Sequence, residues 1–148
     1  MTITIPERIA AARLGTNPSV IRRVPSGWAV MCDMQFLRGY TILLADPVVG
    51  SINDLDRLQR VDYLNDMTLI GDALLEVTGA YRINYGIMGN SDPFLHAHIV
   101  PRYLSEPDKL RTGLPWSYPQ KMVDEVVFDL ERDKELMQQI AAAIQKRL

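Results

Sequence analysis

Two histidines separated by a single residue carry the clearest chemical potential in this sequence. They are His96 and His98, the only histidines of the chain, and they lie in a mostly apolar run from Phe94 to Pro101. Such a run is typical of a β-strand. Because side chains alternate between the two faces of a strand, both imidazoles are expected on one face. The opposite face is wholly apolar and is expected to pack on a helix: Leu95, Ala97 and Ile99.

Two imidazoles on one face form a workable site for phosphorus transfer. A neutral imidazole is a nucleophile, and a protonated one is a general acid or an anion-binding donor. One ring could attack an electrophilic centre while its neighbour donates hydrogen bonds to the negative charge there. The alternative is that both are core histidines satisfied by their neighbours, but groups that can carry charge rarely enter a core without a function.

The segment before these histidines, residues 89–93, is a cluster of turn residues. It is expected to connect a strand at Tyr81–Met88 to the histidine strand and to lie at the mouth of the histidine face. Asn90 and Ser91 are candidates for holding phosphate oxygens or the leaving group, although both could instead satisfy the turn. Asp92 is an unfavourable neighbour for phosphate and is left out of the predicted site.

The run from Leu95 to Arg102 resembles the end of the histidine triad motif, in which three histidines alternate with apolar residues. The lead-in from Ile83 to Asn90 is similar to a bacterial branch of the same superfamily. The resemblance extends roughly from Trp28 to Trp116.

The resemblance implies a role for each histidine and also contains one departure. By position, His96 matches the middle histidine, which is the nucleophile of the family. His98 matches the last histidine, which contacts phosphate oxygens. Phe94 stands where the family has its first histidine. The nucleophile is therefore kept, and how the leaving group receives its proton is left open.

Two further site residues are implied by the resemblance. Asp33, at the end of a predicted strand, matches an acidic or amide residue that bonds the nucleotide ribose, although it could simply cap a loop. Cys32 is a rival alignment, but a thiol is a poor partner for ribose hydroxyls. Trp116 matches an aromatic residue that closes over substrate, sometimes from the other subunit, although it could also be ordinary packing.

Length and composition indicate one globular domain, residues 1–148, of 47% hydrophobic and 23% charged residues. The net charge of −2 argues against a protein that binds nucleic-acid duplexes. The single cysteine, Cys32, cannot form an intrachain disulfide and fits a reducing compartment. No apolar run is long enough to suggest a membrane span, and the start of the chain lacks the features of a secretory signal. A cytoplasmic location is therefore predicted.

The elements predict an α+β fold: an antiparallel β-sheet of about five strands, a long helix on one face and a C-terminal helix, as the resemblance also implies. Residues 1–18 are expected to be an N-terminal extension with a packing role, and residues 104–148 a C-terminal segment and helix. The predicted strands span residues 19–24, 28–33, 41–45, 81–88 and 94–101. The predicted helices span residues 6–14 and 55–77 and the end of the chain, within 129–148.

The long helix at residues 55–77 carries an apolar stripe that should face a sheet or a partner: Tyr63, Met67, Ile70, Leu74 and Val77. In the resembled family the equivalent helix often also serves a two-fold dimer. A homodimer is predicted on these two grounds.

The leading hypothesis is a nucleotide hydrolase or transferase that cleaves at the α-phosphorus of a small nucleoside phosphate conjugate. It acts through a covalent nucleotide on His96 and needs no cofactor or metal of its own. The alternative is a non-catalytic nucleotide-binding regulator, in which Phe94 marks lost chemistry. A third reading is a metal site, since His-x-His can supply two zinc ligands, but Asp33 or Asp92 would then have to provide a third.

Overall fold

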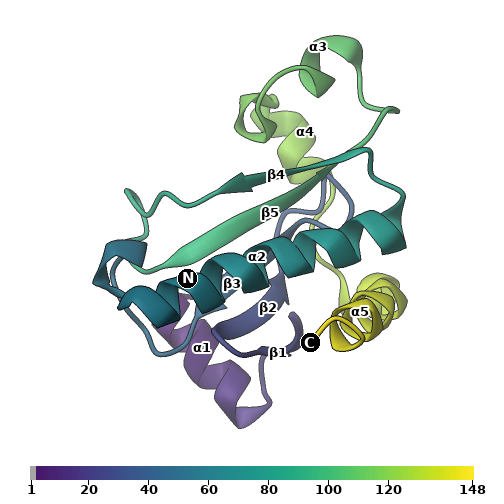
Figure 1. Cartoon of the computed structure of the whole chain (residues 1–148). Coiled ribbons are helices and arrows are strands. Elements are labelled where there is room, and N and C mark those ends of the chain that lie inside the picture. Colours follow the sequence, from purple (N-terminus) through teal and green to yellow (C-terminus); the bar gives the residue numbers. More distant parts are fainter. Residues whose placement is uncertain (1–2) are drawn as a thin grey trace.

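Five antiparallel strands form one sheet in a computed structural model that describes residues 3–148 (Figure 1). Their order across the sheet is β1-β2-β3-β5-β4, so β4 and β1 are the edges. This confirms the predicted fold class. The strands are β1 (Val20–Val24), β2 (Gly27–Met31), β3 (Thr41–Ala45), β4 (Arg82–Gly86) and β5 (His96–Arg102).

The histidine strand is displaced from its predicted bounds, because β5 begins at His96 rather than Phe94 and ends one residue later than expected. The two backbone N–H groups before His96 are bonded outside the sheet. The Leu95 N–H donates to the carbonyl of Val49 at 2.8 Å, and the Phe94 N–H donates to the carbonyl of Asp92 at 2.8 Å. Phe94 therefore belongs to the end of the loop, and the pairing of β5 with β3 starts at His96 opposite Leu44.

The long helix α2 (Arg57–Thr78) begins two residues later than predicted. The reason is its cap: the Asp56 carboxylate accepts from the Gln59 N–H at 2.8 Å, and the Gln59 side chain accepts from the Asp56 N–H at 3.0 Å. The helix ends at Gly79, whose φ of 71° is the left-handed conformation that glycine adopts freely. The C-terminal helix α5 (Leu130–Gln145) is capped by Asp129, whose carboxylate accepts from the Arg132 N–H at 2.9 Å.

The main core lies between the sheet and the two helices α2 and α5. The predicted stripe of α2 faces the sheet, with four members buried and Val77 partly buried. The expected stripe of α5 is buried as well: Leu136, Ile140, Ala143 and Ile144. Leu95, Ala97 and Ile99 enter the same cluster, which confirms that the apolar face of the histidine strand packs on helices.

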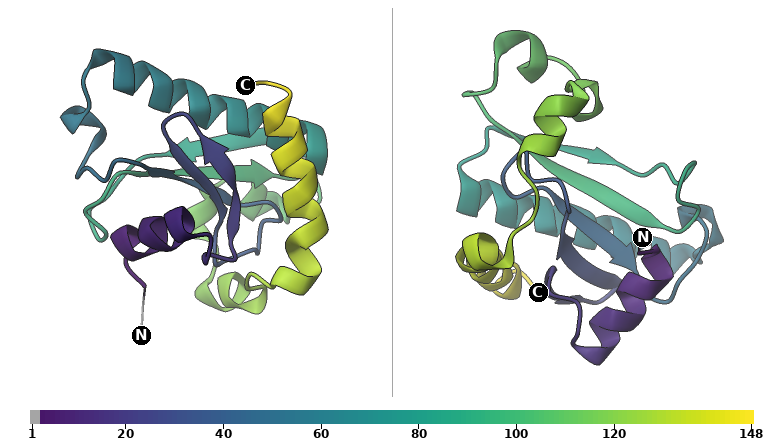
Figure 2. Two further views of the ribbon diagram at one scale, coloured as in Figure 1. Left: turned by 90° about the horizontal axis from the view of Figure 1, so that it is seen from below. Right: turned by 180° about the vertical axis from the view of Figure 1, so that it is seen from behind.

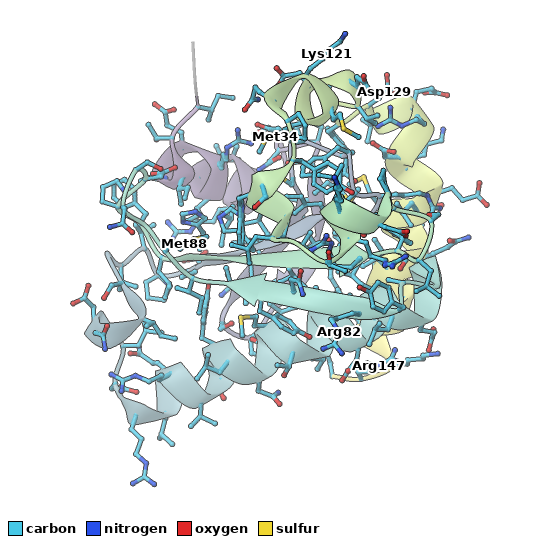
Figure 3. The ribbon with its side chains drawn as sticks, turned by 90° about the horizontal axis from the view of Figure 1, so that it is seen from above. Met34, Arg82, Met88, Lys121, Asp129 and Arg147 are labelled. Atoms are coloured by element: carbon cyan, nitrogen blue, oxygen red, sulfur yellow. The ribbon has the colours of Figure 1, made fainter. Side chains whose placement is uncertain are left out.

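The opposite face of the sheet is covered at its two ends and carries the histidines. Helix α1 (Ile5–Leu14) packs over one end, and Figure 2 shows it across the sheet from α2. Residues 103–125 cover the other end, as Figure 3 shows from above with Lys121 labelled on α4. This segment holds α3 (Asp108–Arg111), η2 (Pro115–Ser117) and α4 (Gln120–Glu125), while η1 (Ile52–Asp54) precedes α2. Within residues 3–148, no helix is both long and apolar enough to cross a membrane.

Candidate active site

The two histidines lie side by side on one face of β5. Their ring centroids are 5.0 Å apart and their planes are inclined by 67°. Both side chains are half-buried, whereas the alternating residues Leu95, Ala97 and Ile99 are buried on the other face. The structure therefore places the imidazoles as the alternation predicts, together and in reach of solvent.

A backbone carbonyl fixes the tautomer of His96. Its Nδ1 lies 2.7 Å from the carbonyl oxygen of Phe94. A carbonyl can only accept, so Nδ1 carries the hydrogen and donates. In the neutral ring Nε2 is then unprotonated and keeps its lone pair. The atom of His96 that is free to act as a nucleophile is therefore Nε2.

A buried tyrosine fixes the opposite tautomer in His98. The Tyr40 hydroxyl lies 2.7 Å from Nδ1 of His98. Burial raises the pKa of Tyr40, so the hydroxyl keeps its proton. Among residues 3–148 this hydroxyl has no other acceptor, so it donates to Nδ1. The ring hydrogen of neutral His98 is therefore on Nε2, which can donate to an anionic oxygen.

His98 is neutral at physiological pH. Burial, and secondarily the neighbouring His96, lower the pKa of His98 to about 4. His98 can therefore bind an anion only as an uncharged N–H donor. The site combines a nucleophilic nitrogen on His96 with a hydrogen-bond donor on His98, on neighbouring positions of one face.

Trp116, on η2, packs against His98 from the same chain. The two ring centroids are 5.6 Å apart and the planes are nearly perpendicular, at 83°. Gly86 in β4 permits this approach, because a Cβ there would lie 2.7 Å from a carbon of the indole ring. The Trp116 side chain remains 45% exposed. The structure thus brings the predicted aromatic residue to the histidine face, and its contact with substrate stays a prediction.

Asp33 shares a cavity of about 170 Å³ with His96. The cavity is walled by apolar side chains of β2, β3 and α1: Val30, Ile42, Leu44 and Ile5. The Asp33 carboxylate accepts two hydrogen bonds from the Arg8 guanidinium, at 2.6 and 3.3 Å. It is nevertheless 61% exposed, so its oxygens can reach a ligand. A second cavity, of about 430 Å³, is lined by the side chains of Arg8 and Asp33 among others.

The loop residues Asn90 and Ser91 lie at the surface. Both are exposed, and within the described part of the chain their side chains make no hydrogen bond. Asp92, which the sequence argument left out, lines the cavity together with His96. The loop therefore reaches the cavity through Asp92, and the roles of Asn90 and Ser91 remain predictions.

Sequence reasoning missed two residues of this site, Arg8 and Tyr40. Arg8 lies on α1, which was expected only to pack. Tyr40 could have been found by parity, because Ile42 pairs with His98 and Tyr40 points to the same face two residues earlier. From its sequence position, Arg102 could either supply positive charge near the site or pair with a surface carboxylate. In the structure it pairs with a carboxylate, but the pair is not at the surface, because Arg102 is 2% exposed and Glu106 is also buried.

The third reading, a metal site, requires a further ligand beside the two histidines. Within residues 3–148, no group of three or more histidine, cysteine, aspartate or glutamate side chains is placed to hold a metal ion. Asp33 and Asp92 line the cavity beside His96 without forming such a group with it.

No protein-family model matches the sequence, and comparison with curated proteins finds no match. Solved structures do match. A histidine triad protein from Marinobacter aquaeolei VT8 has a TM-score of 0.73 at 18% identity, covering 91% of this chain and 94% of that one. A hypothetical histidine triad nucleotide-binding protein from Sulfolobus tokodaii has a TM-score of 0.71 at 14% identity, covering 94% and 91%.

A diadenosine triphosphate hydrolase from Plasmodium falciparum has a TM-score of 0.64 at 15% identity, covering 88% of this chain and 78% of that one. At these identities the likeness concerns the fold. The chain has the fold of histidine triad proteins.

Proposed function

We propose that this protein is a nucleotide hydrolase or transferase that cleaves at the α-phosphorus of a nucleoside phosphate conjugate. The observation that carries the proposal is the pair of contacts at Nδ1, a backbone carbonyl on His96 and a hydroxyl on His98, from which we infer opposite tautomers. Nε2 of His96 presents a lone pair, and Nε2 of His98 presents a hydrogen, on neighbouring positions of one face. A nucleophile and a donor for the non-bridging oxygens are the two groups that this reaction needs.

The reaction proceeds in two displacements. The Nε2 lone pair of His96 attacks the α-phosphorus, and the bond to the leaving group breaks with its electron pair on the leaving-group atom. The imidazole of the resulting covalent nucleotide is positively charged, and its Nδ1–H stays bonded to the carbonyl of Phe94. Water then attacks the same phosphorus, the P–N bond breaks, and the lone pair returns to Nε2 while the proton of the water leaves to solvent.

His98 stabilises the charge on the non-bridging oxygens through its Nε2–H. Removing one donor of this kind costs on the order of 10²–10³ in rate. Asn90 and Ser91 are proposed to assist at the same oxygens or at the leaving group. Phe94 offers no proton at the position where the family has its first histidine, so leaving groups that are stable as anions are the preferred substrates.

The nucleoside is proposed to occupy the cavity beside His96. Its apolar walls suit a base, and the exposed Asp33 carboxylate, held by Arg8, suits the ribose hydroxyls. Two neighbours of the same fold support a nucleotide ligand, since one is described as a nucleotide-binding protein and the other as a diadenosine triphosphate hydrolase. The protein's own residues supply the nucleophile and the donor, so no cofactor is invoked.

The test is intact mass after brief incubation with an adenylyl donor that carries a good leaving group. A nucleotide-sized adduct is expected in the wild-type protein, and it should be lost in His96→Ala. An adduct on histidine is also expected to be labile in acid, unlike one on serine or tyrosine. Nucleotide binding without adduct or product would favour the alternative, a non-catalytic nucleotide-binding regulator.

A homodimer is proposed as the functional form. The stripe of α2 that was expected to face a sheet or a partner is used by the sheet, but α2 also exposes other apolar side chains: Leu58, Val61, Leu64 and Leu75. Sedimentation should give twice the chain mass, and Leu64→Glu should reduce it if this face is the interface. A cytoplasmic location and the absence of a nucleic-acid partner also remain predictions.

A further inference from the structure

One buried guanidinium, that of Arg102, bonds to three parts of the chain at once. It donates to Glu106 at 2.9 Å, to the side chain of Asn84 in β4 at 2.7 Å, and to the carbonyls of Leu110 and Gly113, each at 2.8 Å. Removing such a charge from water is costly unless its partners are complete. Here every nitrogen of the group has a partner, so the contacts hold the surrounding backbone in one arrangement.

Glu106 extends this arrangement to both ends of the segment that follows β5. Its carboxylate accepts from the Tyr103 N–H at 2.6 Å and from the Tyr118 hydroxyl at 2.5 Å. Burial alone would raise the pKa of Glu106, but the hydrogen bonds from Arg102 and Tyr118 hold it below its ordinary value. The carboxylate is therefore ionised, and its ion pair ties the start and the end of residues 103–118 together.

The segment packs on the sheet through Tyr103, Leu110 and Tyr118, which belong to the apolar cluster at that end. Leu104 and Leu114 are exposed, and between them Arg102 bonds to the Glu106 carboxylate and to the backbone carbonyls of Leu110 and Gly113. The carbonyl of Gly113 lies three residues before Trp116. Trp116 therefore lies between two points that the ion pair holds, the Gly113 carbonyl bonded to Arg102 and the Tyr118 hydroxyl bonded to Glu106.

The geometry points to Arg102 as a positioning residue, which holds Trp116 against His98 and thereby keeps that ring desolvated and oriented. Arg102 and His98 lie on the same face of β5, four residues apart, so one strand carries both the histidines and the anchor of the residue that covers them. The packing claim stands on the contacts alone. Its kinetic consequence, weaker stabilisation at the phosphorus when Trp116 is released, rests on the proposed function.

Histidine NMR tests the packing claim without any assay of activity. The chain has only two histidines, so their ring signals can be assigned with His96→Ala. The titratable groups that face His98 are His96 and Tyr40. In the wild-type protein the indole of Trp116 should shift the His98 ring signals, and His98 should not titrate above about pH 5, since its pKa lies at about 4.

Arg102→Gln should move the His98 signals towards those of Trp116→Ala and raise the His98 pKa towards its ordinary value of about 6.5. Arg82→Gln is the matched control. Arg82 is an exposed arginine on β4, directly opposite Arg102 on β5, and the substitution removes the same charge. It should leave the His98 signals unchanged. Tyr118→Phe, which removes one hydrogen bond to Glu106, should shift the His98 signals and pKa in the same direction but by a smaller amount. It replaces Arg102→Gln in the test if that variant does not fold.

A folded Arg102→Gln, or Tyr118→Phe in its place, whose His98 signals and pKa equal those of Arg82→Gln would overturn the positioning role. Equal displacement of both histidines would also overturn it, because that is a general loosening rather than the release of one ring. If the wild-type protein forms no nucleotide adduct, the proposed function fails, while the NMR result still decides the role of Arg102.

Discussion

Tyr40→Phe is the substitution that tests the assignment of hydrogens in the site most sharply. It removes one oxygen from a buried ring and leaves the ring in place. At the histidines, Nδ1 of His98 loses the donor now 2.7 Å away. The ring is then free to place its hydrogen on either nitrogen, and only one of the two tautomers presents Nε2–H to the substrate.

The expected magnitude follows from the energy of one hydrogen bond. A net contribution of about 0.5–1.5 kcal/mol corresponds to a loss of about 2- to 10-fold in kcat. That is well below the roughly 10²–10³-fold loss expected for His98→Ala, which removes the donor itself. Tyr63→Phe is the matched control. It removes a buried hydroxyl that donates to the carbonyl of Leu43 at 2.8 Å and lies on the far side of the sheet. It should cost similar stability and leave kcat unchanged.

Two measurements check this reasoning. Nitrogen NMR of the imidazoles should find the hydrogen of His98 on Nε2 in the wild-type protein and a mixture of tautomers in Tyr40→Phe. Turnover of an adenylyl conjugate should fall within the stated range. A wild-type His98 with its hydrogen on Nδ1, or a Tyr40→Phe enzyme as impaired as His98→Ala, would refute the reasoning.

Three further predictions follow from the same geometry. Because the pKa of His98 falls to about 4 on folding, the unfolded chain binds more protons between about pH 4 and its ordinary pKa of about 6.5. Thermal stability should therefore rise with pH across that window, and His98→Asn should flatten the rise. Asp33→Asn should weaken the binding of ribonucleotides about 10-fold and that of deoxyribonucleotides less, as measured by calorimetry. Equal losses of affinity would show that Asp33 does not bond the ribose hydroxyls. Phe94→His should accelerate substrates with poor leaving groups most, and an equal effect across a leaving-group series would reject a role in protonation at that position.

The fold could be predicted from local patterns. Alternation in the histidine strand placed Ala97 and Ile99 against helices, and the spacing of apolar residues identified the sheet-facing side of α2. The same spacing placed the end of that helix within one residue of Thr78, where it ends. These features depend on the period of each element, which the sequence displays directly.

The parts of the site that escaped prediction depend on contacts between distant segments. Arg8 meets Asp33 only because α1 folds back over β2 and β3, and nothing in the first 18 residues indicates that docking. The burial of Arg102 could not be predicted either. Its carboxylate partner and its carbonyl partners come together only when residues 103–118 fold around it. In each case the contacts form only when separate segments of the chain fold together, so no local pattern indicates them.

The stereochemical course at the α-phosphorus tests the central claim most directly. A substrate with one non-bridging oxygen replaced by sulfur, hydrolysed in isotopically labelled water, reports whether phosphorus was displaced once or twice. Attack by His96 followed by attack by water predicts overall retention of configuration. Inversion would show that water attacks the substrate directly, and it would contradict a covalent nucleotide on His96.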